Sequence, residues 1–382
     1  MASPDHVIRI KGNPIILSQT IGQKELNNKL DQYRKEYLKY FKKNQKISLN
    51  KLTMLNPNPN VIWAPGIGII GIGGDKSGAS LIADIAVQNI KVINSGENLG
   101  GYFPISEKDQ FDIEYWSLEQ AKIKKNTLST IKGKTVIITG AGGVIGRETA
   151  KLFNGNGANV FLVDKDIESL KKTYSLMNKN SFYLLSNLTN SNSAEEIVYS
   201  CLQNFGGIDI LISNAGFAFE SSILDLDIKK LKDSFELNFF AHFNISKEVS
   251  KIFINQGIGG KILFNVSKQA VNPGKNFGSY GLPKSTLMFL LKQMALELGQ
   301  YNISVNGINA DKIRSGILTS DMIEKRSKSR GVDEKKYMTG NLLALEVEAK
   351  HVAEGFLSLS KTERTSAHIL TVDGGNIEAS LR

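Results

Sequence analysis

The chain has 382 residues, a length more typical of two domains than of one. Its 41% hydrophobic and 22% charged residues are usual for a globular protein that builds apolar cores. The single cysteine, Cys201, excludes an intramolecular disulfide framework and suits a reducing compartment, so we expect a cytoplasmic location. The N-terminus shows no secretory signal, and the most apolar stretch, 61–72, is broken by Pro65 and glycines. It is too short to span a bilayer, so no membrane association is expected.

The net charge is +10, with a pI near 9.3. One interpretation is attraction to anions such as phosphorylated substrates, a nucleotide cofactor or nucleic acid. The other is a solvated, lysine-rich surface, which the dispersed placement of the charges favours. Because no nucleic-acid-binding motif accompanies the basic residues, we expect no nucleic-acid partner.

The first 130 residues predict a small α+β segment. An amphipathic helix is expected at 23–41, a turn at 56–60, and a strand, turn and strand at 61–73. A helix with a strand-like end follows at 79–93, then a glycine-broken stretch at 99–102 and a last helix at 111–125. Residues 124–134 form the predicted linker to the second domain, 131–382.

From residue 132 onward, apolar β-branched runs alternate with helical patterns. Strands are expected at 135–139, 159–163, 182–185, 208–213, 261–266, 304–309 and 368–372. Helices are expected at 146–154, 166–178, 193–205, about 228–256 and 280–300. This alternation predicts a doubly wound, Rossmann-type α/β fold, in which helices cover both faces of a parallel sheet.

A glycine-rich turn, TGAGGVIG at 139–146, follows the first of these strands. Gly140 permits the tight turn, Gly143 lets the backbone approach a phosphate, and Gly146 lets the helix pack close to the sheet. A cofactor pyrophosphate would then lie at the helix N-terminus. The alternative is a turn that only connects strand to helix.

Asp164 ends the next strand, where a carboxylate can accept hydrogen bonds from the adenosine ribose. It would repel a 2′-phosphate, which favours NAD over NADP, although Lys165 and Arg147 could soften that preference. Asp164 could instead cap the helix that starts near Asp166.

Ser267, Tyr280 and Lys284 have the chemistry of an acid–base set. The ordinary tyrosine pKa near 10 is too high for efficient proton transfer at neutral pH. An ammonium one helical turn away lowers that pKa, and a serine hydroxyl can orient the substrate oxygen. An isolated Tyr-x-x-x-Lys pair is more often a surface feature, but the upstream serine and glycine motif favour catalysis.

Together these motifs make residues 131–382 resemble the short-chain dehydrogenase/reductase family. SNAG at 213–216, YGLPK at 280–284 and TVDGG at 371–375 complete the match. The resemblance implies that Tyr280 is the general acid/base, that Lys284 binds the nicotinamide ribose, that Ser267 orients the substrate, and that Asn238 helps to hold a relay water. The implied cofactor contacts are Gly140, Gly143, Val144, Ile145, Gly146, Asp164, Asn187, Leu188, Asn214, Ala215, Gly216, Tyr280, Lys284 and Ile313.

The chain departs from the family pattern at a few positions. Val144 stands where a glycine is commonest, and Asn187 replaces an acidic residue often found beside the adenine. Asn309-Ala310-Asp311 replaces the usual Pro-Gly near the nicotinamide. Pro283 lies inside the Tyr–Lys helix, which is tolerable if it lies in the first turn.

Segments 3–12, 64–76 and 111–125 resemble proteins that fuse a class II, zinc-dependent aldolase to a short-chain dehydrogenase and are linked to rhamnulose-1-phosphate cleavage and lactaldehyde oxidation. The chain resembles such a fusion from partway through the aldolase part. A zinc aldolase needs several histidines, whereas His6 is the only histidine before residue 242. We therefore expect no metal site and no aldolase activity from this segment. It is either a remnant or one half of a split aldolase, which a separately encoded half would complete at an edge of the 63–74 strands.

The leading hypothesis is an NAD-dependent oxidoreductase acting on a small aldehyde or hydroxyl compound from deoxy-sugar breakdown, such as lactaldehyde. Alternatives are a dehydrogenase for secondary alcohols of sugars or polyols, or a dehydrogenase-fold subunit that completes an aldolase half. The resemblance implies a homodimer or homotetramer. We expect the polar insert 318–340 to form a mobile lid over the substrate. Arg314, Arg326 and Arg330 could bind a phosphate or carboxylate, but we interpret them mainly as surface charges.

Overall fold

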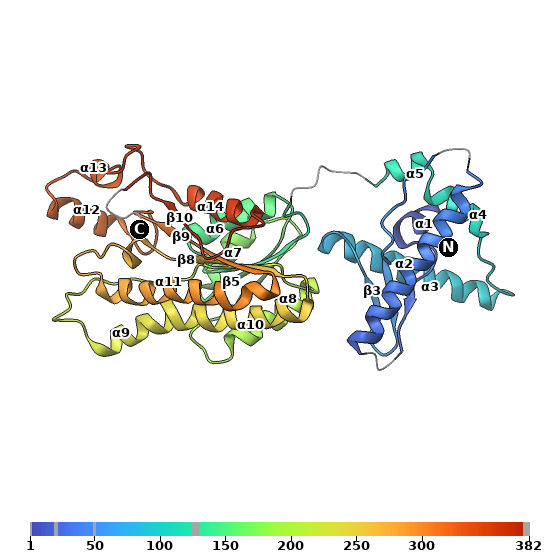
Figure 1. Cartoon of the computed structure of the whole chain (residues 1–382), viewed down its shortest axis with the longest axis horizontal. Helices are drawn as coiled ribbons and strands as arrows, with labels where there is room; N and C mark the ends of the chain where they lie inside the picture. The colour runs from blue at the N-terminus through green and yellow to red at the C-terminus, as the bar shows by residue number, and fades with distance from the viewer. Residues whose placement is uncertain (1, 19–21, 49–50, 124–129, 377–382) are drawn as a thin grey trace. The chain divides into compact units, whose positions relative to one another are not determined.

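The computed structural model of the chain describes residues 2–18, 22–48, 51–123 and 130–376. The chain forms two compact units, Met1–Leu128 and Ser129–Arg382, and each is described here by itself. Figure 1 shows the elements of each unit in chain order. Among the described helices, none is both long and apolar enough to cross a membrane.

The first unit contains a three-stranded sheet between two long helices. The strands are β1 (Ile15–Ile16), β2 (Val61–Ala64) and β3 (Gly68–Gly71), in the order β1-β2-β3. β1 runs parallel to β2, and β3 pairs antiparallel to β2. The helices are α1 (Pro4–Ile10), α2 (Gln23–Gln45), α3 (Lys76–Asn98), α4 (Glu107–Glu114) and α5 (Ser117–Ala121).

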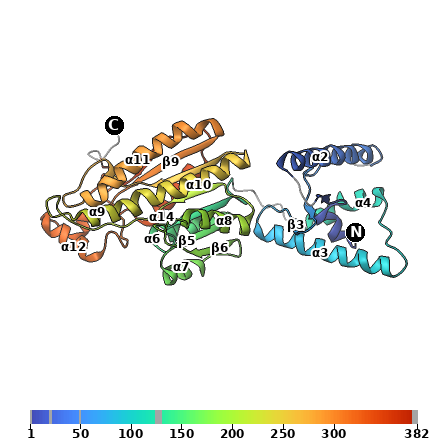
Figure 2. The ribbon, with the colours of Figure 1, turned by 90° about the horizontal axis from the view of Figure 1, so that it is seen from below.

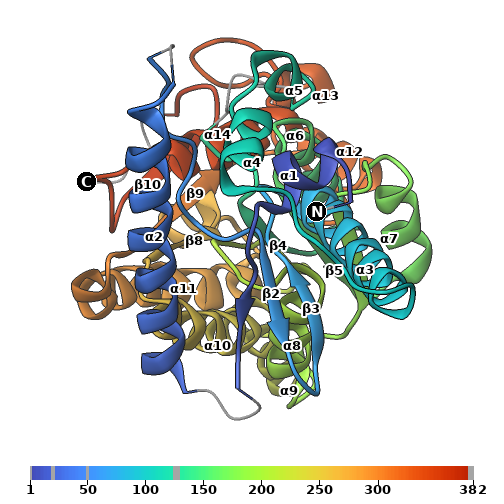
Figure 3. The same cartoon turned by 90° about the vertical axis from the view of Figure 1, so that its right-hand side faces the viewer.

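The strand alternation of β2 explains why α2 and α3 lie on opposite faces of this sheet. Ile62 and Ala64 pack toward Leu26 and Leu30 of α2. The intervening Val61 packs with α3 residues such as Ala86. Figures 2 and 3 show the two helices on opposite sides of the strands. The unit therefore has its own small core on each face of the sheet.

Three predictions for this unit were wrong in detail. The helix expected at 79–93 does not run into a strand-like end but is helical from Lys76 to Asn98, and its Ile82, Ile85 and Ala86 form an apolar face against the sheet. The helix expected at 111–125 divides into α4 and α5, and its residues 124–125 lie outside the described part. Tyr115 ends α4 and stacks on Phe111, with ring centroids 4.5 Å apart. The short elements α1 and β1 were not predicted.

The second unit is built on a seven-stranded sheet in which every pairing is parallel. Its order is β10-β9-β8-β7-β4-β5-β6, which confirms the predicted doubly wound fold. The strands are β4 (Thr135–Thr139), β5 (Asn159–Asp164), β6 (Ser181–Leu185), β7 (Ile210–Ser213), β8 (Gly260–Asn265), β9 (Ile303–Ala310) and β10 (Ile369–Val372).

Helices cover both faces of this sheet, and each face has its own core. Ile137 of β4 belongs to the core beneath α8 (Ser193–Phe205), α10 (Ala241–Gln256) and α11 (Gly278–Leu298). Its neighbours Val136 and Ile138 belong to the core beneath α6 (Val144–Gly155), α7 (Ile167–Tyr174) and α14 (Ala349–Lys361). Figure 2 shows α10 and α11 running side by side. A strand buried on both faces explains the continuous apolar run TVIIT.

The helix expected at about 228–256 is not uniform. It begins as α9 (Ile228–Phe235), passes through a π-helical turn, Glu236–Phe240, and continues as α10. The amide of Ala241 donates to the carbonyl of Glu236, five residues earlier. A π-turn is rare and is frequent at functional sites. It contains Asn238, one of the predicted site residues.

The predicted lid contains two short helices, α12 (Ser320–Ser329) and α13 (Glu334–Met338). They enclose a small core of their own, in which Ile323, Tyr337 and Met338 are buried. The helix expected at 166–178 is shorter, because Asp166 caps α7 from outside and the chain turns after Tyr174.

Candidate active site

The glycine turn after β4 has the geometry that its sequence predicts. Gly140 has a φ of +65°, and a Cβ there would lie 2.8 Å from the Cα of Ala215. A Cβ on Gly146 would lie 2.1 Å from the carbonyl oxygen of Gly140, so α6 can approach β4 only with glycine there. Sequence reasoning missed Gly142, where a Cβ would lie 2.8 Å from the Cβ of Ser169.

A cavity of about 260 Å³ opens beside this turn, at the carboxyl ends of β4, β5 and β7. Most of the predicted cofactor contacts line it: Gly140, Gly143, Val144, Ile145, Asp164, Asn187, Leu188, Asn214, Ala215 and Gly216. Gly146 does not, since its role is to let α6 pack. We call this cavity the cofactor cleft.

Asp164 forms the far wall of the cofactor cleft. Its Oδ2 accepts from the amide of Gly142 at 2.8 Å, and its Oδ1 accepts from the amide of Asp166 at 3.1 Å. The cap of α7 is Asp166, whose carboxylate accepts from the amides of Glu168 and Ser169. The capping interpretation of Asp164 was therefore wrong, and its carboxylate is committed to the glycine turn. Arg147 donates to the Gly142 carbonyl at 2.8 Å.

A smaller cavity of about 110 Å³ adjoins the cofactor cleft, and we call it the catalytic cavity. Ser267, Tyr280 and Ile313 line it, and it shares Ile145 and Asn265 with the cofactor cleft. Ser267 follows β8, whereas Tyr280 comes from the first turn of α11. The structure therefore brings the predicted acid–base residues to the wall between cofactor and substrate spaces.

Burial dominates the electrostatics of the acid–base pair. It raises the pKa of Tyr280 to about 12, although a hydrogen bond with the Ser267 hydroxyl acts in the opposite direction. Burial also lowers the pKa of Lys284 to about 7. The Nζ of Lys284 lies 5.7 Å from the centre of the Tyr280 ring. The expected lowering of the tyrosine pKa is therefore not seen in this structure, in which burial raises that pKa.

An amide network behind the pair was missed by sequence reasoning. Lys284 donates to the backbone carbonyl of Asn265 at 2.9 Å, and the Asn265 side chain donates to the Asn214 side chain at 2.8 Å. Asn214 in turn donates to the Thr139 carbonyl at 3.1 Å. The ends of β8, β7 and β4 are thus joined by side chains that follow each strand.

Asn238 is buried in the π-turn, and its side chain holds the chain segment opposite. Its Oδ1 accepts from the amide of Phe217 at 3.1 Å, and its Nδ2 donates to the carbonyl of Phe217 at 2.8 Å. A Cβ on Gly216 would lie 3.2 Å from that Oδ1 and 3.8 Å from the Nζ of Lys284. The side chain therefore positions the floor of the cofactor cleft.

The expectation that Pro283 lies in the first turn of its helix was wrong, because α11 begins at Gly278. A proline at this position has no N–H for the carbonyl of Ser279. The hydroxyl of Ser234 donates to that carbonyl at 2.6 Å instead, and Ser234 also accepts from Asn238 at 3.0 Å. The Ser279 carbonyl, which lacks its helical donor, is therefore hydrogen-bonded by Ser234, and Ser234 also contacts Asn238 of the π-turn.

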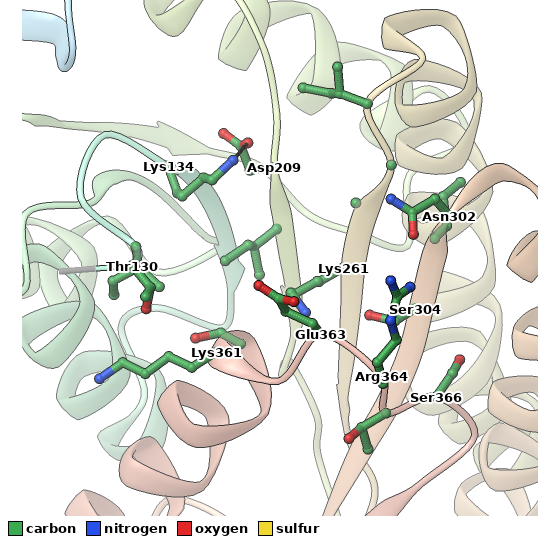
Figure 4. A pocket seen from close by; sticks show the side chains of 18 of the residues that line it. Thr130, Lys134, Asp209, Lys261, Asn302, Ser304, Lys361, Glu363, Arg364 and Ser366 are labelled. Atoms are coloured by element: carbon green, nitrogen blue, oxygen red, sulfur yellow. Dashed lines mark hydrogen bonds and ion pairs between the residues drawn. The ribbon is translucent and has the colours of Figure 1, made fainter. Parts of the chain in front are cut away.

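A larger cavity of about 560 Å³ lies at the opposite, amino-terminal ends of the strands. Its wall includes the ion pair of Lys134 and Asp209, with N and O 2.7 Å apart, and Figure 4 shows the two side chains pointing toward each other. Ligands of open parallel sheets bind at the carboxyl ends. We therefore place the candidate active site at the two smaller cavities, which lie at the carboxyl ends of the strands, although this cavity is larger.

Comparison with known proteins decides the family. The short chain dehydrogenase family model matches residues 134–329, which is more than half of the chain. The chain belongs to the short-chain dehydrogenase/reductase family. It is accordingly an NAD(P)-dependent oxidoreductase, as predicted.

Residues 1–123 match a second family model, the second domain of class II aldolases, which confirms the resemblance of the N-terminal segment. Among the described residues, no group of three or more His, Cys, Asp and Glu side chains could hold a metal ion. His6 contacts Ser3 and Gln88, at 2.8 and 2.5 Å.

Individual relatives agree with the dehydrogenase match. The Bacillus subtilis oxidoreductase YuxG is 26% identical over 98% of this chain, which spans 57% of its length. Short-chain dehydrogenase reductase 4 of Arabidopsis thaliana is 32% identical, over 70% of this chain and 91% of its own. A solved 7α-hydroxysteroid dehydrogenase in complex with NADH is 28% identical with a TM-score of 0.58, over 65% of this chain and 96% of its own.

Proposed function

We propose that the second unit is an NAD-dependent oxidoreductase for a small aldehyde or hydroxyl compound of the kind released in deoxy-sugar breakdown, such as lactaldehyde. The observation that carries the proposal is the common wall of the cofactor cleft and the catalytic cavity. Ser267 and Tyr280 line a space of only about 110 Å³, which suits a short reacting end. In this scheme residues 131–382 carry the activity, and residues 1–130 are a truncated, non-catalytic aldolase-like segment.

The cofactor cleft fits a dinucleotide by its backbone shape. Gly143 precedes the first residue of α6 and provides no side-chain cap, so the amides of the first helical turn remain available to a pyrophosphate. The half-buried Asp164 supports NAD over NADP, because a 2′-phosphate near this carboxylate would be repelled. Lys165 lines the same cleft and is the nearest residue to Asp164 that would soften this preference.

The bound nicotinamide would exchange a hydride with the reacting carbon of the substrate. Tyr280 exchanges the proton of the substrate oxygen, and its raised pKa keeps the phenol protonated, ready to donate during reduction. Ser267 orients the same oxygen by a hydrogen bond. Lys284, held by the Asn265 carbonyl, provides the charge that favours loss of the Tyr280 proton during oxidation. An aldehyde would be oxidised through its hydrate, which supplies the hydroxyl.

Two other functions fit particular features of the chain. Oxidation of a secondary alcohol of a sugar or polyol would use the same residues. A dehydrogenase-fold subunit that completes a separately encoded aldolase half would explain the match of residues 1–123, but it would not need the acid–base set. We also propose a cytoplasmic location and a homodimer or homotetramer, by analogy with the family.

The test is NADH formation by the purified chain with L-lactaldehyde and a panel of sugars and polyols. Tyr280→Phe should lower turnover by roughly 10²-fold or more, because general acid–base catalysis contributes that much. Tyr301→Phe, on an exposed tyrosine at the end of α11, serves as the matched control. Both variants should bind NADH like the original chain. Full activity of Tyr280→Phe, or turnover by neither the original chain nor the control, would contradict the proposal.

A further inference from the structure

A fourth cavity, of about 660 Å³, borders the catalytic cavity on the side of α12 and α13. The two share Gln269, Asp311, Lys312, Arg326 and Tyr337, so they meet along one wall. In the proposed function, the end of the substrate remote from Tyr280 would face these shared residues. We call this fourth cavity the distal cavity.

The distal cavity is lined mainly by positive charge. Its charged residues are the cations Lys268, Lys275, Lys312, Arg326 and Arg330 and the single carboxylate of Asp311. Two of the cations are neutralised by ion pairs. Lys268 contacts Asp311 at 2.9 Å, and Arg326 contacts Glu220 at 3.0 Å. A cleft lined by one sign of charge concentrates ligands of the opposite sign.

Lys312 and Arg330 carry the uncompensated charge nearest to the catalytic cavity. Both approach the ring of Tyr337, at 5.0 and 5.1 Å from its centre, and within the described residues neither forms an ion pair with a carboxylate. Lys312 has a φ of +49°, in the left-handed region that a lysine adopts only at a cost. The backbone strain at Lys312 and the repulsion between the charges of Lys312 and Arg330 are both unfavourable. A bound anion would offset the repulsion.

The electrostatic environment of Lys312 agrees with this geometry. Burial is the largest of the effects that lower the pKa of Lys312, and the charges of Lys268 and Arg330 act in the same direction. Asp311 and Asp373 act in the opposite direction and do not reverse the shift. An anion bound near Lys312 and Arg330 would act in the opposite direction and raise the pKa of the lysine.

The other arginines noted in the sequence differ from Arg330. Arg314 pairs with Glu346 at 2.6 Å and does not line the distal cavity. Arg326 pairs with Glu220 and stacks on Phe277, with 4.0 Å between the guanidinium carbon and the ring centre. Arg326 thus forms part of the wall, and Arg330 is the arginine whose charge is left for a ligand. The sequence does not distinguish these three arginines, because all of them are interpreted mainly as surface charges.

We propose that Lys312 and Arg330 form a binding subsite for an oxyanion, a carboxylate or a phosphate monoester, at the end of the substrate remote from the reacting carbon. This inference rests on the proposed function for the position of the reacting carbon. Hydrogen bonds between charged partners are about twice as strong as neutral ones, and a guanidinium can bind either oxyanion with two donors. Within the proposed function, this subsite favours small hydroxy or aldehyde compounds that carry a terminal acid over neutral ones such as lactaldehyde.

The first experiment compares NAD-dependent turnover of matched alcohols that differ in the terminal group. The pairs are 3-hydroxybutyrate with 1,3-butanediol, and glycerol 3-phosphate with glycerol. Lys312→Met and Arg330→Met should each raise the KM for the acidic member roughly tenfold or more, with kcat and the neutral member little changed. Lys328→Met is the matched control, because Lys328 lies on α12, pairs with Glu324 and does not line the distal cavity. Equal use of acidic and neutral members, unaffected by the variants, would overturn the inference.

The second experiment does not depend on turnover. Inorganic phosphate and acetate are titrated by calorimetry against the protein with NADH bound, and the stronger of the two identifies the oxyanion. Lys312→Met should weaken its binding roughly tenfold, whereas Lys328→Met should not. Loss of binding in Lys312→Met without turnover of any alcohol would support the subsite and contradict the proposed function. Equal anion binding by the original chain and Lys312→Met would overturn the subsite and leave the proposed function untouched.

Discussion

The Nζ of Lys284 donates to the backbone carbonyl of Asn265 at 2.9 Å, which ties the predicted catalytic lysine to the end of β8. The same asparagine holds Asn214 through its side chain at 2.8 Å. The lysine is therefore fixed between the cofactor cleft and the catalytic cavity by the framework of the sheet. Its position does not depend on a direct bond to the Tyr280 hydroxyl, so each of the two residues can be tested separately.

Lys284→Met should abolish turnover and also make the protein more stable. The pKa of Lys284 is about 7 in the folded chain and 10.5 as its ordinary value. Between these values the unfolded chain binds a proton that the folded chain lacks, so this residue lets stability rise with pH. The destabilisation caused by burying the charged amine of Lys284 is fully present below pH 7. The gain in Tm of Lys284→Met over the original chain should therefore be larger at about pH 6 than at about pH 9. A lower Tm than the original chain at both pH values would show that the bond to Asn265 outweighs the burial of the amine.

Two glycines of α6 should respond in opposite ways to alanine. In Gly146→Ala the new methyl group would lie 2.1 Å from the Gly140 carbonyl oxygen, so the helix must move away from β4. We expect a loss of about 1–3 kcal/mol and of NADH binding. Gly155→Ala meets no atom within 4 Å and should gain up to about 1 kcal/mol without affecting NADH. Denaturant unfolding and NADH fluorescence distinguish the two, and unchanged NADH affinity in Gly146→Ala would refute the packing role.

The neighbouring carboxylates of Asp164 and Asp166 are expected to have different roles. Asp164 is proposed to select the cofactor, whereas Asp166 caps α7. Asp164→Ala should raise the KM for NAD and narrow the preference over NADP, because the repulsion of a 2′-phosphate is removed. Asp166→Ala should cost about 0.5–2 kcal/mol of stability, since it removes the cap of α7, with cofactor preference retained. Steady-state kinetics with both cofactors provide the measurement. Equal shifts in preference for the two variants would mean that the loop, and not the Asp164 carboxylate, selects the cofactor.

Asn238→Ala should weaken the floor of the cofactor cleft. The substitution leaves the partly buried amide and carbonyl of Phe217 without the partners that they have at 3.1 and 2.8 Å. A loss of about 1–3 kcal/mol is expected, together with weaker NADH binding. Ser234→Ala removes a neighbouring hydroxyl that contacts Asn238 and the Ser279 carbonyl, and it should lower stability with a smaller effect on NADH. Stronger loss of NADH affinity in Ser234→Ala than in Asn238→Ala would contradict this order.

Local patterns were enough to predict most of the second unit. A strand buried on both faces needs a continuous apolar run, and TVIIT occupies the strand Thr135–Thr139 as predicted. The spacing of Gly140 and Gly146 encodes a close approach of helix and strand that no other residue allows. The four-residue interval between Tyr280 and Lys284 likewise places both on one helix face. Each of these signals acts within one or two turns of the chain, so the sequence by itself determined the fold class and the order of the predicted cofactor and acid–base residues.

Tertiary structure alone decided the features that depend on distant partners. The strand-like end expected for the 79–93 helix is helical, within a helix that packs Ile82, Ile85 and Ala86 on a sheet formed by other residues. Burial, which depends on the whole fold, sets the pKa values of Tyr280 and Lys284. The convergence of Lys312 and Arg330 on Tyr337 joins the end of β9 to two lid helices. Spacing along a chain specifies which residues share a helix face or a turn, whereas burial and unpaired charge arise from neighbours that only the folded chain brings together.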